Sequence, residues 1–191
     1  MLTKLFAQLN AMSPLSEGFE SDLKKRVLIL SLPKNHCLVE IAKVADHAYF
    51  LNSGFAMAFR YIGGRKHVEE LYKAGSIVVS PKSFFSRMPS VESIQLLEDS
   101  EVLHLSYEDL IALFSAHPVA HKLCEVTLSQ YYEESRERIH DLQYLSAVER
   151  YEKLERTFPK VEQLLPQEYV ASYLGIAPQS LSRIKREQRA L

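Results

Sequence analysis

The chain has 191 residues, of which 47% are hydrophobic and 25% are charged, as is typical of a water-soluble globular protein of one or two domains. Its formal net charge of −1 excludes a protein that is basic over its whole surface, so any contact with nucleic acid has to come from a local patch of cations. No apolar run approaches the roughly 20 residues of a membrane span, and the N-terminal segment lacks a secretory cleavage-site pattern. The two cysteines are too few for a structural zinc site or an iron–sulfur cluster. We therefore expect a cytoplasmic protein without a membrane partner.

The first 26 residues are predicted to form two helices. Leu2, Leu5, Phe6 and Leu9 recur on one helical face before Pro14 interrupts the pattern. Ser16 is a suitable N-cap for a second helix, whose apolar side is formed by Phe19, Leu23 and Val27. These helices are expected to pack on the segment that follows.

From Val27 to Leu105 the hydrophobic period changes to two. Short β-branched or aromatic runs are separated by turn residues such as Gly63-Gly64, which favours a tight hairpin. The most even alternation, from Ala56 to Tyr61, places Phe55, Met57 and Phe59 on one face of a strand. The pattern predicts an antiparallel barrel or jelly roll.

From about Tyr107 onward the pattern is helical. A short helix ends before Pro118, and a long one runs from about Val119 to Tyr144, with Glu134 and Arg138 spaced to pair at i,i+4. Its apolar positions follow the spacing of a coiled-coil seam: Leu128, Tyr132, Ser135, Ile139 and Leu142. The seam could dock on the β domain, but a helix of about 26 residues is about 39 Å long, more than a small barrel covers. We therefore favour pairing with a second copy, which makes this a dimerisation helix.

The last segment predicts a helix-turn-helix. Ser146 can cap a helix that ends at Pro159, and a polar connection follows. Val170, Ala171 and Leu174 share a face of the next helix, with Ala171 where two helices would cross. Gly175 can end that helix and Pro178 can begin another, whose buried side is Leu181 and Ile184. A helical hairpin that only closes a small core is the alternative interpretation.

The outer face of the last helix favours DNA binding over that alternative. It carries amides, hydroxyls and cations, with no carboxylate before Glu187, and such groups pair with base edges and phosphates. The candidate DNA-binding residues are Gln179, Ser180, Ser182, Arg183, Lys185, Arg186 and Arg189. The predicted fold class is α+β, with N-terminal helices and a jelly-roll-like antiparallel β-roll (1–116), a long dimerisation helix (117–145) and a small all-α helix-turn-helix domain (146–191).

With this order of elements, the chain resembles the Crp/Fnr family of bacterial transcription regulators. The resemblance is most specific over SAVERYEKLERTFPKVEQLLPQEYVASYLGIAPQSLSRIKRE, which is similar to a short-tailed branch seen in Bacteroidetes-type bacteria, and IQLLEDSEVLHLSYEDL looks like the end of the family's sensor domain. It implies a homodimer that binds an inverted-repeat operator in double-stranded DNA, and it points to RNA polymerase as a further partner. In the family an Arg two residues after the central apolar residue of the recognition helix contacts DNA, and Leu181 and Arg183 match that pattern.

Several positions depart from the family pattern. Gln179 stands where a base-reading Glu is frequent, and Pro178 replaces a polar or basic side chain. The chain ends at Leu191 without the strands of a wing, so we expect phosphate contacts chiefly from Lys185, Arg186 and Arg189.

The sensor half departs further from members of the family that bind cyclic AMP. Aligned without gaps from Gly75, the ribose-binding Gly-Glu pair falls at Val79 and Ser80, and the phosphate-binding Arg falls at Ser90. Without its cation a buried phosphate loses a charge-assisted pair. Lys82 or Arg87 could substitute from nearby, but we expect the roll to bind cyclic AMP weakly or not at all, and we predict no other cofactor.

Other site types are less well supported. His36, His47, His67 and His104 lie in or beside predicted strands, but the spacing of a metal site is absent, and we expect surface or turn histidines. No nucleophile motif, phosphate loop or carboxylate pair predicts an enzyme. A second function remains open, namely a ligand-sensing roll that acts by protein contact with the helix-turn-helix as a packing element. The exposure of Arg183 and Lys185 should distinguish the two.

Overall fold

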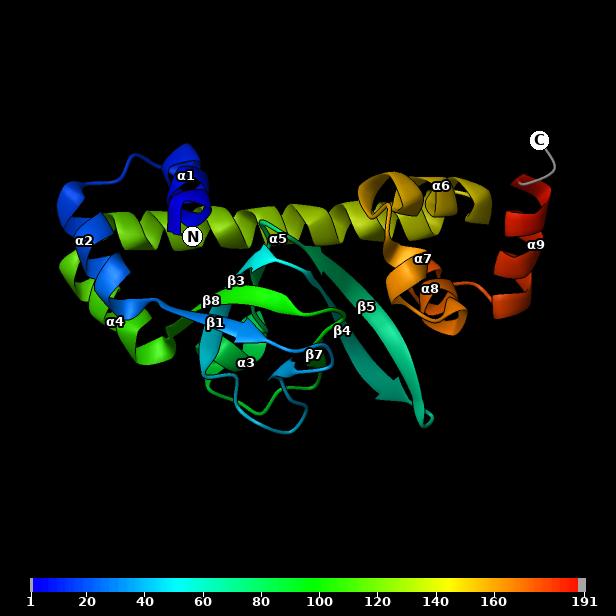
Figure 1. Ribbon diagram of the computed structural model, residues 1–191, viewed down its shortest axis with the longest axis horizontal. Coiled ribbons are helices and arrows are strands. Elements are labelled where there is room, and N and C mark those ends of the chain that lie inside the picture. The colour runs from blue at the N-terminus through cyan, green and yellow to red at the C-terminus, as the bar shows by residue number, and fades with distance from the viewer. Residues whose placement is uncertain (1, 189–191) are drawn as a thin grey trace.

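The computed structural model describes residues 2–188 (Figure 1). The chain forms a mixed α and β fold, as predicted, in which two N-terminal helices, a β-roll, one long helix and a group of short helices follow one another. The N-terminal helices and the last helix lie at opposite ends of the long axis (Figure 1).

The roll consists of two four-stranded antiparallel sheets with the strand orders β1-β8-β3-β6 and β2-β7-β4-β5. The strands are β1 (Leu28–Leu32), β2 (Cys37–Val39), β3 (His47–Ser53), β4 (Phe55–Ile62), β5 (Arg65–Lys73), β6 (Ile77–Val78), β7 (Ser93–Leu96) and β8 (Ser100–Ser106). Between the sheets lies a core that includes Leu51, Ala56, Val78, Ile94 and Leu96. This arrangement confirms the predicted jelly-roll-like architecture.

The β4–β5 hairpin is buried on both faces along most of its length, whereas its tip is exposed. Gly63 and Gly64 form its turn with φ angles of 58° and 76°, a conformation that side chains other than glycine rarely adopt. The pairing register shifts between Ala58 and Phe59, so that Ala58 pairs with Glu70 and Phe59 with Val68. Inward-facing residues of the hairpin join the core between the sheets, whereas outward-facing residues join a second core that it shares with the C-terminal helices.

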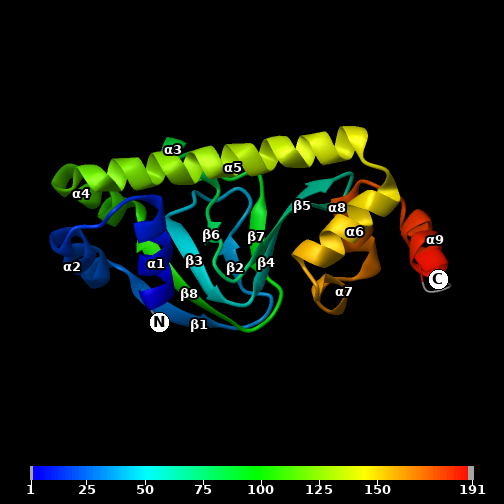
Figure 2. The same ribbon diagram turned by 90° about the horizontal axis from the view of Figure 1, so that it is seen from above.

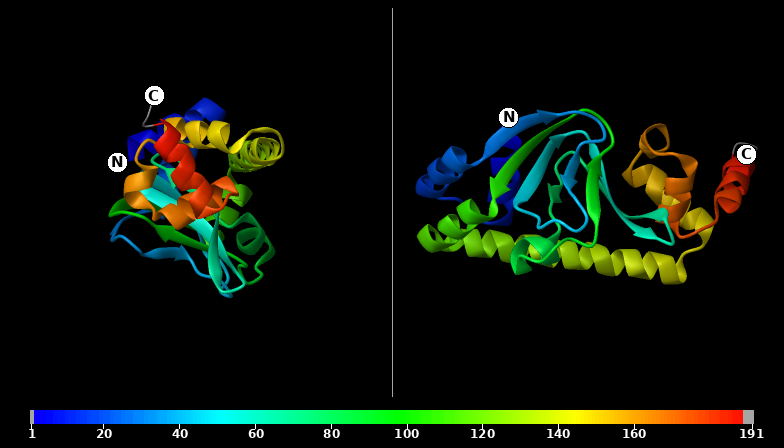
Figure 3. Two further views of the ribbon diagram at one scale, coloured as in Figure 1. Left: turned by 90° about the vertical axis from the view of Figure 1, so that its right-hand side faces the viewer. Right: turned by 90° about the horizontal axis from the view of Figure 1, so that it is seen from below.

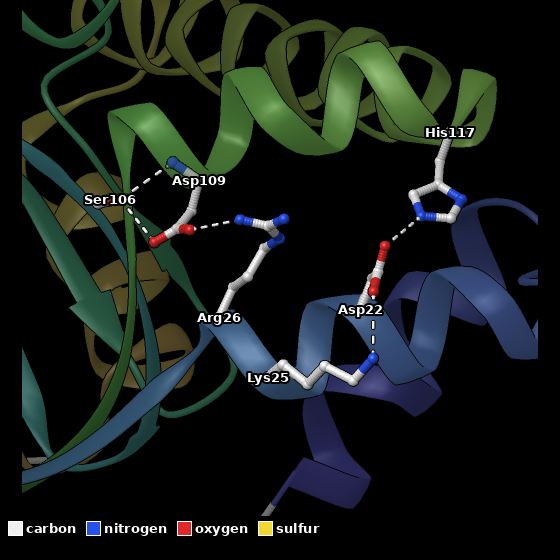
Figure 4. A network of polar contacts seen from close by, with 6 residues as sticks. All are labelled: Asp22, Lys25, Arg26, Ser106, Asp109 and His117. Atoms are coloured by element: carbon white, nitrogen blue, oxygen red, sulfur yellow. Dashed lines mark hydrogen bonds and ion pairs between the residues drawn. The ribbon is translucent and has the colours of Figure 1, made fainter.

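The N-terminal helices pack against the start of the long helix. They are α1 (Leu2–Met12) and α2 (Glu17–Arg26), and Ser16 caps α2 as predicted by accepting a hydrogen bond from Phe19 N. In Figure 4, Arg26 of α2 pairs with Asp109 at an N–O distance of 2.7 Å, and Asp22 lies 3.0 Å from the Nε2 atom of His117. The Ser106 hydroxyl and the Arg26 guanidinium lower the pKa of Asp109. These contacts tie α2 to α4 (Tyr107–Ala116), the short helix that leads out of the roll.

The long helix α5 (Pro118–Tyr144) passes along the roll and continues beyond it to the C-terminal helices (Figure 2). With 27 residues it is about 40 Å long. It therefore connects the two ends of the molecule. Between β6 and β7 the chain forms one further short helix, α3 (Pro81–Ser86).

Four short helices complete the chain: α6 (Ala147–Thr157), α7 (Val161–Leu164), α8 (Gln167–Leu174) and α9 (Pro178–Gln188). Ser146 and Glu149 form a capping box at the start of α6, which confirms the predicted cap. The connection predicted to be polar contains α7, and its Val161 and Leu165 are buried. A single helical turn is too short to show a hydrophobic period, so no pattern in the sequence indicates α7.

Candidate nucleic-acid interface and effector cleft

Helices α8 and α9, joined by the turn after Gly175, lie where the two helices of a helix-turn-helix are predicted. Ala171 and Leu181 are fully buried between them, next to Leu174 and Ile184. Gly175 ends α8 with a φ angle of 67°, and a Cβ atom there would lie 3.1 Å from the side chain of Leu142. Both the backbone conformation and the close approach of α5 therefore favour glycine at this position.

The exposed face of α9 carries most of the predicted DNA-binding residues. Gln179, Ser182, Arg183 and Arg186 are exposed, and Ser180 is half-buried. The Arg183 side chain is 68% exposed and its only ion-pair partner among residues 2–188 is Glu187, at 4.0 Å. Arg189 lies outside the described residues. Figure 3 shows α9 at the end of the molecule, outside the roll.

Two of these residues are already engaged within the chain. The Lys185 ammonium group lies 2.7 Å from a carboxylate oxygen of Glu162, and both side chains are largely buried. The Ser182 hydroxyl donates to the carbonyl of Pro178 at 3.1 Å and accepts a hydrogen bond from Gln167. The structure therefore leaves Gln179, Arg183 and Arg186 as the freest polar groups on this face of α9 within the described part of the chain.

The C-terminal helices share a hydrophobic core with the roll. Met57, Phe59, Val68 and Leu71 from the outer face of the β4–β5 hairpin belong to the same buried cluster as Tyr151, Leu154, Val170 and Ile184 from the C-terminal helices. Helix α8 packs directly on β5, where the backbone N–H of Val68 donates to the Ser172 hydroxyl at 3.1 Å. The position of the C-terminal helices is thus coupled to β5.

Two arginines hold the C-terminal end of α8. Arg138 of α5 donates to the carbonyl of Tyr173 at 2.7 Å and stacks on its ring, and Arg150 of α6 donates from Nε to the carbonyl of Leu174 at 3.0 Å. Cations at these carbonyls satisfy acceptors that the helix itself leaves open. The i,i+4 pair expected between Glu134 and Arg138 is absent from the described ion pairs, because Arg138 turns toward α8 instead.

The predicted seam on α5 remains largely uncovered in a single chain. Leu128, Tyr132, Ile139 and Leu142 are between 37% and 60% exposed. The Ser135 hydroxyl donates to the carbonyl of Tyr131 within the helix. A row of exposed apolar side chains is unusual on a solvated helix. This exposed row supports the predicted dimer, which stays a prediction.

A cleft of about 680 Å³ lies between β5, α5 and the C-terminal helices. On the side of the roll its lining includes Glu70 and Tyr72 of β5, and on the side of α5 it includes Tyr131 and Glu134. Burial raises the pKa of Glu70, and burial together with the nearby Glu70, Glu92 and Glu134 raises the pKa of Tyr72. Sequence reasoning missed these residues, although Glu70 and Tyr72, two apart in a strand, share a face.

The positions that the family resemblance aligns with a cyclic-nucleotide site lie close together inside the roll. Ser80 and Ser90 are buried with their hydroxyl oxygens 3.4 Å apart. Ser80 donates to a carboxylate oxygen of Glu92 at 2.6 Å, and Ser90 donates to the backbone carbonyl of Glu92 at 2.8 Å. Val79 is half-buried beside them on the lining of the cleft. The serine pair therefore contacts a carboxylate where a cyclic phosphate needs a cation.

Lys82 and Arg87, the two proposed substitutes for the missing arginine, make no hydrogen bond with Ser80 or Ser90. Arg87 pairs with Asp46, donates to the carbonyl of Ala45 at 2.9 Å and lies 4.4 Å from the ring centroid of Tyr107. Lys82 is exposed and makes no ion pair with the described residues. These contacts support the expectation that the roll binds cyclic AMP weakly or not at all.

The histidines show no metal-binding arrangement. Among residues 2–188 no group of three or more His, Cys, Asp or Glu side chains is placed to hold a metal ion. His104 is partly buried rather than a surface residue: its ring lies 4.7 Å from that of His47, and burial lowers its pKa. No helix in the described part of the chain is both long and apolar enough to cross a membrane.

Comparison with known proteins agrees with this geometry. Residues 29–117 match the family model of the cyclic nucleotide-binding domain. The match covers the roll and helix α4. It confirms the predicted type of sensor domain, whereas the short-tailed branch suggested by the C-terminal residues stays a prediction.

Solved structures extend the likeness to most of the chain. It is similar to CLP, a c-di-GMP responsive global regulator of Xanthomonas campestris, at 16% identity over 92% of each chain with a TM-score of 0.70. It is also similar to FixK2 of Bradyrhizobium japonicum, at 16% identity over 86% of this chain and 85% of that one, with a TM-score of 0.68. Catabolite activator protein of Thermus thermophilus matches at 19% identity over 95% and 86%, with a TM-score of 0.58. A comparison with curated protein sequences found no match. At these identities the likeness establishes the fold.

Proposed function

We propose that this protein is a homodimeric, sequence-specific DNA-binding transcription regulator of the Crp/Fnr type, controlled through its roll. The observation that carries this proposal is the exposed polar face of α9 at the end of the molecule, where Gln179, Arg183 and Arg186 are free to meet DNA. The fold also matches that of proteins whose names describe a global regulator and a catabolite activator.

The groups on this face suit the major groove. A Gln amide can pair with adenine, and an Arg guanidinium can donate two parallel hydrogen bonds to guanine. Arg186 lies three residues after Arg183, on the same face, and is suited to a phosphate contact. We therefore assign sequence recognition chiefly to Gln179 and Arg183.

The exposed seam of α5 supports the dimer. If two copies pair along Leu128, Tyr132 and Ile139, their coiled-coil contact buries apolar surface that a single chain leaves exposed. A twofold dimer presents two recognition helices to successive major grooves about 34 Å apart, so its operator is an inverted repeat.

Action through protein contact alone is the alternative function, and one observation favours it. Lys185 is paired with Glu162 inside the chain, as a packing element would require. Arg183, however, is exposed with only a distant partner in its own helix, and this favours DNA binding. RNA polymerase fits either function as an additional partner.

Selection of bound sequences from random DNA, followed by measurement of affinity, tests the proposal. We expect an inverted repeat bound by two chains, with affinity that falls steeply as salt rises because phosphate counterions are released. Arg183→Ala should weaken binding to the selected site by about 1–3 kcal/mol.

Arg65→Ala is the matched control for that variant. Arg65 is exposed at the tip of the β4–β5 hairpin, so its removal changes the net charge equally and should leave operator affinity nearly unchanged. Equal binding by the Arg183 variant and the parent would show that α9 does not read DNA through this residue. Selection that yields no preferred sequence would favour the protein-contact function.

A further inference from the structure

Lys185 of α9 belongs to a polar network that joins three of the C-terminal helices. Its ammonium group lies 2.7 Å from Oε1 of Glu162 in α7, and the two side chains are only 22% and 30% exposed. The same carboxylate oxygen accepts a hydrogen bond of 2.9 Å from the hydroxyl of Tyr151 in α6. Tyr151 is buried in the core that the C-terminal helices share with the roll. The network therefore connects the outermost helix of the molecule with that core.

The Tyr151 hydroxyl lies between two carboxylates. It is 2.9 Å from Oε1 of Glu162 and also 2.9 Å from Oε1 of Glu155. A hydroxyl has a single proton, so it can donate to only one ionised carboxylate at a time. Burial raises the pKa of Tyr151 and the two carboxylates raise it further, so the hydroxyl keeps this proton. Two carboxylates at one hydroxyl require a positive charge nearby, and Lys185 is the only cation paired with either of them among residues 2–188.

The neighbouring cations of α9 are held much less firmly. Arg186, the next residue, is exposed and makes no ion pair within the described part of the chain, and Arg183 reaches only Glu187 at 4.0 Å. An exposed pair contributes little to stability, so a DNA phosphate can replace its carboxylate at small cost. Withdrawal of Lys185 would instead leave Glu162 and Glu155 facing one hydroxyl without a cation, and loss of one partner from a partly buried pair is costly.

The position of Lys185 on α9 gives its ion pair a geometric consequence. Leu181 and Ile184 anchor one face of the helix in the core. Lys185 lies about 100° around the helix from Ile184. A contact on that flank opposes rotation of α9 about its own axis, and such a rotation would displace Gln179 and Arg183 from the base edges that they are proposed to read.

We propose that Lys185 is a positioning residue of α9 rather than a phosphate contact, and that with Glu162 and Tyr151 it sets the orientation in which α9 meets the operator. The inference rests on the proposed DNA-binding function. It gives two residues on other helices a part in sequence recognition, and it removes one cation from the set available to phosphates.

Fluorescence anisotropy with the full chain tests the inference. Affinity is measured over a range of salt concentrations for a duplex that carries the selected inverted repeat and for a duplex of unrelated sequence. Lys185→Gln should lower the preference for the operator over the unrelated duplex on the order of tenfold. The salt dependence should stay that of the parent, because no phosphate contact is lost. Lys185→Arg, which keeps the charge, should retain most of the preference.

Arg186→Gln is the matched comparison, because it removes the same charge one residue further along α9. Loss of a phosphate contact weakens binding to both duplexes equally and lowers the slope of log affinity against log salt concentration. The slope should fall by about 0.9 for each chain, or about 1.8 for a dimer.

Glu162→Gln distinguishes a positioning pair from a masked phosphate contact. Positioning predicts the same loss of operator preference as in Lys185→Gln, and the double variant should lose no more than either single variant. A phosphate contact held back by Glu162 would instead be released, and binding to both duplexes would become tighter. Unfolding curves establish that each variant is folded at the temperature of the binding measurement.

Three results would overturn the inference: a fall of the salt slope in Lys185→Gln as large as in Arg186→Gln, tighter binding of both duplexes by Glu162→Gln, or additive losses in the double variant. Each of them leaves the proposed function intact, because the parent still prefers its operator. A parent that prefers no sequence would overturn the proposed function and this inference together.

Discussion

The two faces of strand β5 differ in composition: one is apolar and the other is polar. Toward α8, Val68 and Leu71 are buried in an apolar core, and Ser172 satisfies the backbone N–H of Val68. Toward the cleft, Glu70 and Tyr72 keep polar groups that lack full partners. The first face has the composition of a protein interior, whereas the second places a partly buried carboxyl group on the lining of a cleft. Comparison of the two faces indicates where substitutions should destabilise the protein and where they should stabilise it.

Removal of an apolar side chain from the face toward α8 should cause the largest loss in the free energy of unfolding. Leu71→Ala leaves a cavity between the roll and the C-terminal helices, and such substitutions cost about 2–5 kcal/mol. Denaturant unfolding should show this loss. Ile62→Ala, which truncates an exposed side chain of the same hairpin, should change stability by less than about 0.5 kcal/mol. Similar losses in both variants would show that the hairpin is not a rigid part of the core.

Removal of the arginine that bridges α6 and α8 should have a smaller effect. Arg150→Ala leaves the carbonyls of Leu174 and Leu145 without their donor, and hydrogen bonds to a charged group contribute about 1.5–3 kcal/mol. Arg150→Lys should restore only part of this stability, because an ammonium group cannot donate in both directions with the geometry of a guanidinium. Full stability of the alanine variant would show that these contacts do not hold α8 in place.

Neutralising Glu70 on the face toward the cleft should have the smallest effect on the free energy of unfolding, and it should raise that free energy rather than lower it. Since burial raises the pKa of Glu70 in the folded protein, the folded state keeps this proton at a higher pH than the unfolded chain. Stability is therefore lost as pH rises from the ordinary value of 4.5 through the raised pKa. Glu70→Gln should be more stable than the parent at neutral pH, and the difference should disappear below pH 4.5. Urea unfolding between pH 4 and 8 measures it, and a less stable Gln variant at pH 7 would contradict the sign.

The sequence was informative wherever the structure depends on neighbours along the chain. The caps at Ser16 and Ser146, the Gly63-Gly64 turn, the left-handed Gly175 and the helix start at Pro178 were all predicted and are all observed. Each depends on the conformational preference of one residue or on a hydrogen bond across one turn, so the local sequence suffices.

The candidate sites were harder to predict, because their charges depend on distant partners. Lys185 looks like a free cation in the sequence, but Glu162, 23 residues earlier, neutralises it. Arg138 was assigned to Glu134 by helical spacing, yet it binds Tyr173. The spacing of residues in a sequence shows which face of a helix a charged side chain occupies. It does not show which carboxylate or carbonyl oxygen from a distant segment will pair with that side chain.

By itself the sequence determined the main elements of this protein, their order and the outward face of its last helix, though not the short helices α3 and α7. It could do so because hydrophobic period and turn residues act over a few positions. The tertiary structure alone decided which charges on that face stay free, and it alone brought Glu70 and Tyr72 to Tyr131 and Glu134 across a cleft. Those residues meet only after the roll has closed and the long helix has packed on it. Burial and pairing then set their charges, and both are properties of the assembled core.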